Sequence, residues 1–280
     1  MSKKFTLLKI PIIIFAFIFI SACSGEQGQN GENEESETSG IETESDNVFN
    51  KNITYRLPSP VELYIFLDDN EAVFQEDAIN SSDNVSKYFT NQSKTINFGI
   101  YASDLAYSTV FGQHQQTFSY FKIVRELADQ LGYAEGFNMA IVSRMENNQY
   151  NLDSLYQIAN DAYWDACIYL EEQEQHDALA LIYTGGWIES LYISIKSVKQ
   201  FNPDDPIIIR IAEQQILLDN LIGTYYTIDE ELQPKELLNK LIYLQSIYDK
   251  LYDNTDVIIT EEQYNEIASE VESLRNEFTG

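Results

Sequence analysis

Apolar residues return at helical spacing along most of this chain, whereas the alternation typical of a half-buried strand is almost absent. A polar, irregular stretch covers residues 68–86. Beyond it, the pattern predicts helices over residues 94–110, 117–131, 136–147, 152–173 and 177–199. A further helix is predicted to begin at Asp205-Pro206 and to end at Gly223, by N-cap and C-cap rules. The predicted fold class is therefore all-α, a multi-helix bundle.

The stretch Leu179–Val198 (residues 179–198) is apolar on nearly every side, which predicts the central, buried helix of this bundle. Glu189 and Lys196 interrupt the stretch, so it does not read as a clean membrane span. Gly185 and Gly186 lie in its middle, where each costs about 1 kcal/mol relative to alanine. A close approach by another backbone or by a ligand would offset that cost. We expect the helix that contains Gly99 to be the neighbour.

The C-terminal part has the most regular pattern. Residues at heptad spacing form two series, Leu237, Leu241, Leu244, Tyr248 and Leu251, then Tyr264, Ile267, Val271, Leu274 and Phe278. Thr260 and Gln263 have the spacing of a capping box at the start of the second series. Two amphipathic helices joined by a short connection predict an antiparallel helical hairpin.

The N-terminus has the features of a targeting segment. Lys3, Lys4 and Lys9 form a positive region, which an apolar run at residues 10–20 follows. The sequence Ile20-Ser21-Ala22-Cys23 resembles the lipobox of bacterial lipoproteins. This resemblance implies a signal peptide over residues 1–22, acylation of Cys23, and attachment to a membrane without spanning it. The alternative is an ordinary signal peptide with an accidental cysteine.

Residues 23–46 have a composition that cannot bury enough apolar surface to fold. They contain eight acidic residues and no lysine or arginine. We expect an acidic tether that holds the rest of the chain about 25–30 Å from the lipid. Residues 47–280 are then a single all-α domain. The expected location is the cell envelope, with the outer membrane favoured and the face of that membrane left open.

The formal net charge is −28, and loss of the three signal-peptide lysines makes it −31. This balance argues against nucleic-acid binding, which needs Lys and Arg to neutralise phosphates. It also argues against adsorption on anionic lipid surfaces. The expected partners are the membrane, through the lipid anchor, and either an envelope protein or a small ligand.

Sequence motifs for known chemistry are missing: there is no P-loop, no H-E-x-x-H, no G-x-S-x-G and no EF-hand loop. The histidines, His114 and His176, lie in polar stretches that we interpret as loops between helices. Cys167 falls among apolar helical positions and is expected to be a buried thiol. We therefore expect no metal, no cofactor and no enzymatic activity.

Two acids inside apolar helices, Asp104 and Glu189, need partners if they are buried, because an unpaired buried charge is costly. Arg144 and Arg210 are the predicted partners, since both arginines are set in apolar runs. The structural interpretation is a buried ion-pair network that fixes helix register. The functional interpretation is a small polar pocket between the central helices, lined by Tyr101, Tyr107, Gly185, Gly186, Trp187 and Tyr192.

The segments Gly99–Tyr107 and Thr184–Glu189 also resemble uncharacterised all-helical envelope lipoproteins of Gram-negative bacteria. That resemblance carries no activity with it. Three hypotheses follow: a non-catalytic helical binding or scaffolding module, a ligand-capturing lipoprotein with a Tyr/Trp-lined pocket, and a hydrolase that uses Asp104 and Glu189. The first hypothesis is the favoured interpretation. A glycosidase would need two carboxyls about 5–9 Å apart in an open cleft.

Overall fold

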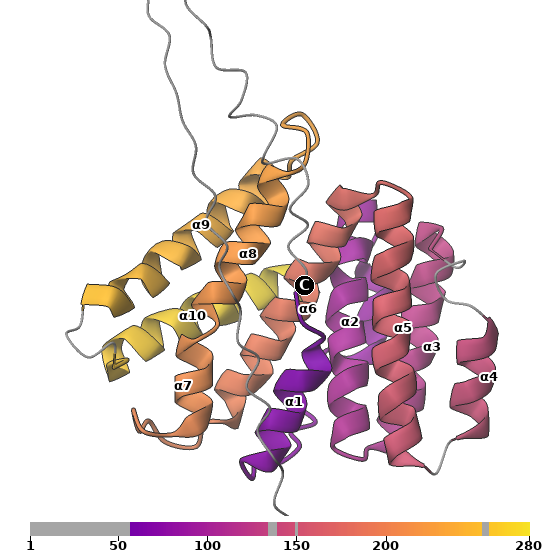
Figure 1. The fold of residues 1–280 in the computed structure, drawn as a ribbon, viewed down its shortest axis with the longest axis horizontal. Coiled ribbons are helices and arrows are strands. Elements are labelled where there is room, and N and C mark those ends of the chain that lie inside the picture. The colour runs from indigo at the N-terminus through magenta and orange to yellow at the C-terminus, as the bar shows by residue number, and fades with distance from the viewer. Residues whose placement is uncertain (1–56, 134–138, 149–150, 254–257) are drawn as a thin grey trace, which may run out of the picture. The chain divides into compact units, whose positions relative to one another are not determined.

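The computed structural model describes residues 57–133, 139–148, 151–253 and 258–280, and these residues form helices with no strand among them (Figure 1). The all-α prediction is confirmed. The predictions for residues 1–22 and 23–46, including acylation of Cys23, concern residues outside the described ranges. The elements are α1 (Pro60–Asp69), η1 (Ser82–Lys87), α2 (Asn91–Val110), α3 (His114–Leu131), α4 (Met139–Asn147), α5 (Leu152–Glu172), α6 (His176–Ser197), α7 (Pro206–Ala212), α8 (Gln215–Tyr226), α9 (Lys235–Asp249), η2 (Lys250–Asp253) and α10 (Glu261–Thr279).

The helix starts follow from local side-chain chemistry. Ser59 caps α1 by accepting a hydrogen bond from the Val61 N–H, and Pro60 occupies the first helical position. Asp205 and Pro206 begin α7 in the same way. Thr260 and Gln263 form the predicted reciprocal capping box at the start of α10. These caps satisfy amide groups that the first turn of a helix leaves without partners.

Helices α2 and α6 form the centre of the fold, where their backbones touch. A Cβ atom built on Gly185 would lie 2.0 Å from the Ile96 carbonyl oxygen, and one built on Gly99 would lie 2.1 Å from the Ile182 carbonyl oxygen. The predicted close contact with the Gly99 helix is therefore confirmed for Gly185. Gly186 differs, because its Cβ would stay 3.5 Å from the nearest atom, the Gly99 carbonyl oxygen.

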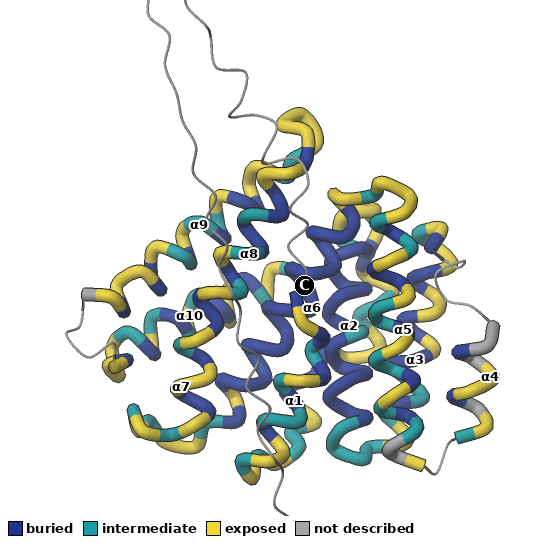
Figure 2. The backbone as a smooth tube through the Cα atoms, in the orientation of Figure 1, coloured by how far each residue is buried: buried dark blue, intermediate teal, exposed yellow. Residues whose placement is uncertain are grey.

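Nearly every residue of α6 is buried, as the dark blue tube in Figure 2 shows. Among the described helices, α6 is long and apolar enough to cross a membrane, but 94% of its most apolar window is buried by the other helices. Helices α1, α2, α5, α7, α8 and α10 all pack against α6. The predicted central helix is confirmed as the core of the bundle.

Helices α9 and α10 form the predicted antiparallel hairpin (Figure 1). Two ion pairs set the direction, since Lys240 near the start of α9 binds Glu277 near the end of α10, while Lys250 binds Glu266. The buried residues of this hairpin include Leu241, Leu244, Ile267, Val271 and Leu274.

Three boundary predictions were wrong. The chain breaks into α7 and α8 at Glu213-Gln214, where one continuous helix was expected. Gly223 lies inside α8 and does not end it, since the residues that follow it keep helical geometry up to Tyr226. His114 and His176 are the first residues of α3 and α6 and are not loop residues.

Candidate functional site

A buried polar network joins four helices and the irregular segment before η1. We define it as Asn80, Asp104, Tyr120, Glu189 and Arg275. Arg275, from α10, forms two hydrogen bonds to Glu189, with Nε–Oε2 and Nη2–Oε1 distances of 3.1 Å each. The Asn80 N–H donates to Asp104 Oδ2 at 3.1 Å, and the Tyr120 hydroxyl donates to the Asn80 carbonyl at 2.7 Å. The network thus attaches the segment around Asn80 to α2, α3, α6 and α10.

The two carboxyls of this network have no exposed surface. Burial and the nearby Glu189 carboxylate raise the pKa of Asp104 well above its usual range. Burial also raises the pKa of Glu189, but Arg275 opposes that rise. The consistent arrangement is a neutral Asp104 that donates a hydrogen bond to an ionised Glu189, which Arg275 neutralises. The pair has no open face for a substrate.

The predicted partners of these acids were wrong. Arg144 lies on the surface and pairs with Asp161 at 2.8 Å, with both side chains about half exposed. Arg210 pairs with Glu213 on the next turn at 3.3 Å. Arg275 takes the role that sequence reasoning gave to them. It occupies the apolar face of α10, four residues after Val271 and three before Phe278, and that spacing is a signal that Arg275 faces the core, although it does not identify Glu189 as the partner.

The tyrosines that were predicted to line a polar pocket instead form hydrogen bonds or ring contacts in and around this network. The Tyr101 hydroxyl donates to the Ser81 carbonyl at 2.8 Å, and the Tyr107 hydroxyl accepts the Gln75 N–H at 3.0 Å. The Tyr192 ring lies 4.7 Å from the Arg275 guanidinium carbon, in cation–π geometry. These tyrosines hold the residue 73–81 segment and Arg275 in place, and they do not line an open pocket.

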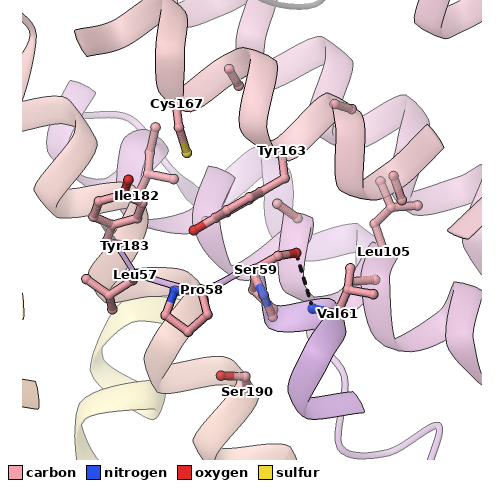
Figure 3. A pocket seen from close by; sticks show the side chains of 18 of the residues that line it. Leu57, Pro58, Ser59, Val61, Leu105, Tyr163, Cys167, Ile182, Tyr183 and Ser190 are labelled. Carbon is pink, nitrogen blue, oxygen red and sulfur yellow. Dashed lines mark hydrogen bonds between the residues drawn. The ribbon is translucent and has the colours of Figure 1, made fainter. Parts of the chain in front are cut away.

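A cavity of about 340 Å³ borders the α2–α6 contact, since Gly99 and Gly186 form part of its wall. Its wall is formed by the start of α1 and by side chains from α2 to α8, mostly carbon. Figure 3 shows Tyr163 of α5 pointing into this apolar cavity, with Cys167, Tyr183 and Leu57 around its hydroxyl end. Burial raises the pKa of Tyr163 well above its usual range, so its phenol stays neutral.

Three of the predicted site residues, Gly186, Trp187 and Arg210, line the apolar cavity, whereas Tyr101, Asp104, Tyr107, Arg144, Gly185, Glu189 and Tyr192 do not. The expected single polar pocket is therefore two separate features, a closed polar network and an apolar cavity. The predicted burial of Cys167 is confirmed, and its side chain forms part of the cavity wall. Sequence reasoning missed Tyr163 and Tyr183, which the apolar helical pattern does not distinguish from core residues.

The polar groups of the cavity wall are few. Trp187 Nε1 donates to Gln214 Oε1 at 3.1 Å, which satisfies the indole in a buried position. The Ser190 hydroxyl donates to the Trp187 carbonyl at 2.9 Å. Within the described ranges, no three His, Cys, Asp or Glu side chains gather where they could hold a metal ion. The chemistry of this wall is that of a binding site for carbon-rich molecules.

Comparison with known proteins adds no relative: no family model, no curated protein and no solved structure matches this chain.

Proposed function

We propose that this chain is a lipid-anchored, non-catalytic binding protein of the bacterial cell envelope, and that it holds an apolar small molecule in the cavity. The observation that carries the binding proposal is the size and composition of that cavity. An apolar cavity of about 150 Å³ is large enough to admit benzene. A cavity of about 340 Å³ with a mostly carbon wall has room for a considerably larger molecule.

The complete burial of Asp104 and Glu189 supports a non-catalytic role for these two residues. A hydrolase needs its two carboxyls in an open cleft, where they contact substrate and water. Here both carboxyls are fully buried, and both oxygens of Glu189 accept hydrogen bonds from Arg275. Burial and these hydrogen bonds are what we expect of carboxyls that stabilise the fold.

The binding proposal is tested with the neutral fluorescent probe 1-N-phenylnaphthylamine. The mature-length chain with Cys23→Ser keeps every described residue and cannot be acylated, so no detergent is needed. We expect saturable one-to-one binding with a rise in probe fluorescence. Ala162→Phe, which places a ring in the cavity from the buried face of α5, is expected to weaken binding at least tenfold.

The control for this experiment is Ile168→Phe, which adds a ring on the exposed side of the same helix and should leave probe affinity unchanged. Ala166→Leu fills less of the cavity and serves if Ala162→Phe fails to fold, as thermal unfolding would show. A wild-type domain that does not bind the probe contradicts the proposal. Equal binding by the filled and control variants contradicts it as well.

The anchoring proposal rests on the lipobox at residues 20–23 and on the positive, apolar segment before it. Cys23→Ser removes the thiol that would be acylated, so we expect complete loss of fatty-acid incorporation and of signal-peptide processing at this site. Metabolic labelling with a clickable fatty acid, followed by gel fluorescence of the purified chain, measures this. Undiminished label in the variant would refute the lipoprotein assignment.

A further inference from the structure

The apolar cavity is extended, because helices on both sides of α1 and α6 contribute to its wall. Arg210 of α7 and Leu217 of α8 line it on one side, while Phe121 of α3 and Met145 of α4 line it on the other. Figure 1 shows α7 and α8 on the opposite side of α1 from α3 and α4. A slot that runs across several helices suits a chain-like molecule better than a compact ring system.

The charged side chains of the described cavity wall are Glu62 and Arg210. The Arg210 guanidinium carbon lies 4.4 Å from the ring centroid of Phe66, which also lines the cavity. This stacking holds the planar group in place at the wall. In the described part of the chain its nitrogens donate no well-formed hydrogen bond, and the contact to Glu213 is a half-exposed pair at 3.3 Å. Such a pair contributes little to stability.

Glu62, the acidic residue of the wall, has a position that favours its charge. It lies in the first turn of α1, where a carboxylate is favourable at the positive end of the helix dipole. Arg210 lies in the last turn of α7, where a cation is likewise favourable at the negative end of the helix dipole, and its stacking on Phe66 keeps it at the cavity wall. Acidic residues more than about 8 Å away are largely screened at physiological ionic strength, and Glu213 forms only a half-exposed pair with Arg210, so Arg210 is the cation of the described wall that a headgroup can bind.

We infer that the ligand is a single-chain amphiphile with an acidic headgroup, whose alkyl chain fills the slot toward α3 and α4 while its headgroup binds Arg210. This inference rests on the proposed binding function and specifies the ligand class for the same cavity. A guanidinium can donate two parallel hydrogen bonds to a carboxylate or to a phosphate oxygen pair. The Phe66 ring keeps the guanidinium oriented for that contact.

The test measures displacement of 1-N-phenylnaphthylamine from the mature-length Cys23→Ser chain by three ligands that share one alkyl chain: dodecanoate, methyl dodecanoate and dodecylamine. We expect dodecanoate to displace the probe at the lowest concentration. Arg210→Gln is expected to weaken dodecanoate about tenfold, the effect of losing a charge-assisted hydrogen bond, and to leave methyl dodecanoate unchanged. Arg210→Lys should restore part of the loss, since it keeps the charge.

Arg125→Gln is the matched control, because it removes the same charge from the exposed face of α3 and should not change dodecanoate affinity. The inference is overturned if dodecanoate and its methyl ester compete equally, if dodecylamine is preferred, or if Arg210→Gln weakens both ligands alike. In each of these cases probe binding that Ala162→Phe abolishes still supports the proposed function. Absence of probe binding contradicts the proposed function itself.

Discussion

Arg275→Met is expected to lower the free energy of unfolding by about 3–5 kcal/mol, because it leaves the Glu189 carboxylate buried without a counter-charge. Arg275 is itself only slightly exposed and donates two hydrogen bonds to Glu189, plus one to the Ala78 carbonyl at 3.3 Å. Removal of these hydrogen bonds therefore loosens the contacts among three elements: α6, α10 and the segment before η1. Urea unfolding of the purified chain measures it.

The matched control is Arg144→Met, since Arg144 forms an ion pair with Asp161 at the surface and should cost less than about 1 kcal/mol. A double variant with Arg275→Met and Glu189→Gln should recover part of the lost stability, because no buried charge remains. Equal losses for Arg275→Met and Arg144→Met would show that Glu189 does not depend on Arg275.

The same network predicts a pH dependence with a definite sign. The folded state raises the pKa of Asp104 well above its ordinary value of 3.8, so folding takes up a proton above that pH. Stability should fall as pH rises from 3.8 toward the folded pKa. Asp104→Asn can keep the hydrogen bonds to Asn80 and Glu189 without titrating, so its stability should fall less steeply. The pKa of Glu189 is also raised, so the free energy of unfolding of the Asp104→Asn variant should still depend on pH in part. Urea unfolding between pH 5 and 8 measures this, and parallel curves would contradict a neutral Asp104.

Sequence patterns predicted the parts of this fold that depend on neighbours along the chain. The apolar character of residues 179–198 predicted a buried central helix, and heptad spacing predicted the α9–α10 hairpin. The two glycines predicted a close backbone contact, because their propensity cost needs an offset. Each of these predictions depends only on the residue types within one helix and on their spacing.

The partner of Glu189 could not be predicted in the same way, because it lies 86 residues away on α10. Periodicity indicates that Arg275 is on an apolar face, but it does not indicate which helix that face meets. The cavity could not be predicted from the sequence either. Ala162 and Tyr163 look like ordinary core positions, and whether a core position borders a void depends on how several helices pack together.

The contact between α2 and α6 gives the second large effect. Gly185→Ala is expected to destabilise the chain by about 1–3 kcal/mol or more, because its Cβ would overlap the Ile96 carbonyl and force the two backbones apart. Alanine's better helix propensity, about 1 kcal/mol, offsets only part of this cost. Gly99→Ala should behave in the same way, since its Cβ would overlap the Ile182 carbonyl.

Gly186→Ala is the control that makes this prediction specific. The added Cβ would lie 3.5 Å from the Gly99 carbonyl oxygen and 3.7 Å from Pro60 Cγ, which are ordinary contacts. With no overlap to relieve, the better helix propensity of alanine remains, so the variant should match or exceed the wild-type midpoint of urea unfolding. The two glycines are adjacent in sequence and both are buried, so neither composition nor burial distinguishes them. The two positions differ only in the direction that an added side chain would take. Equal midpoints of urea unfolding for Gly185→Ala and Gly186→Ala would refute the close contact at Gly185.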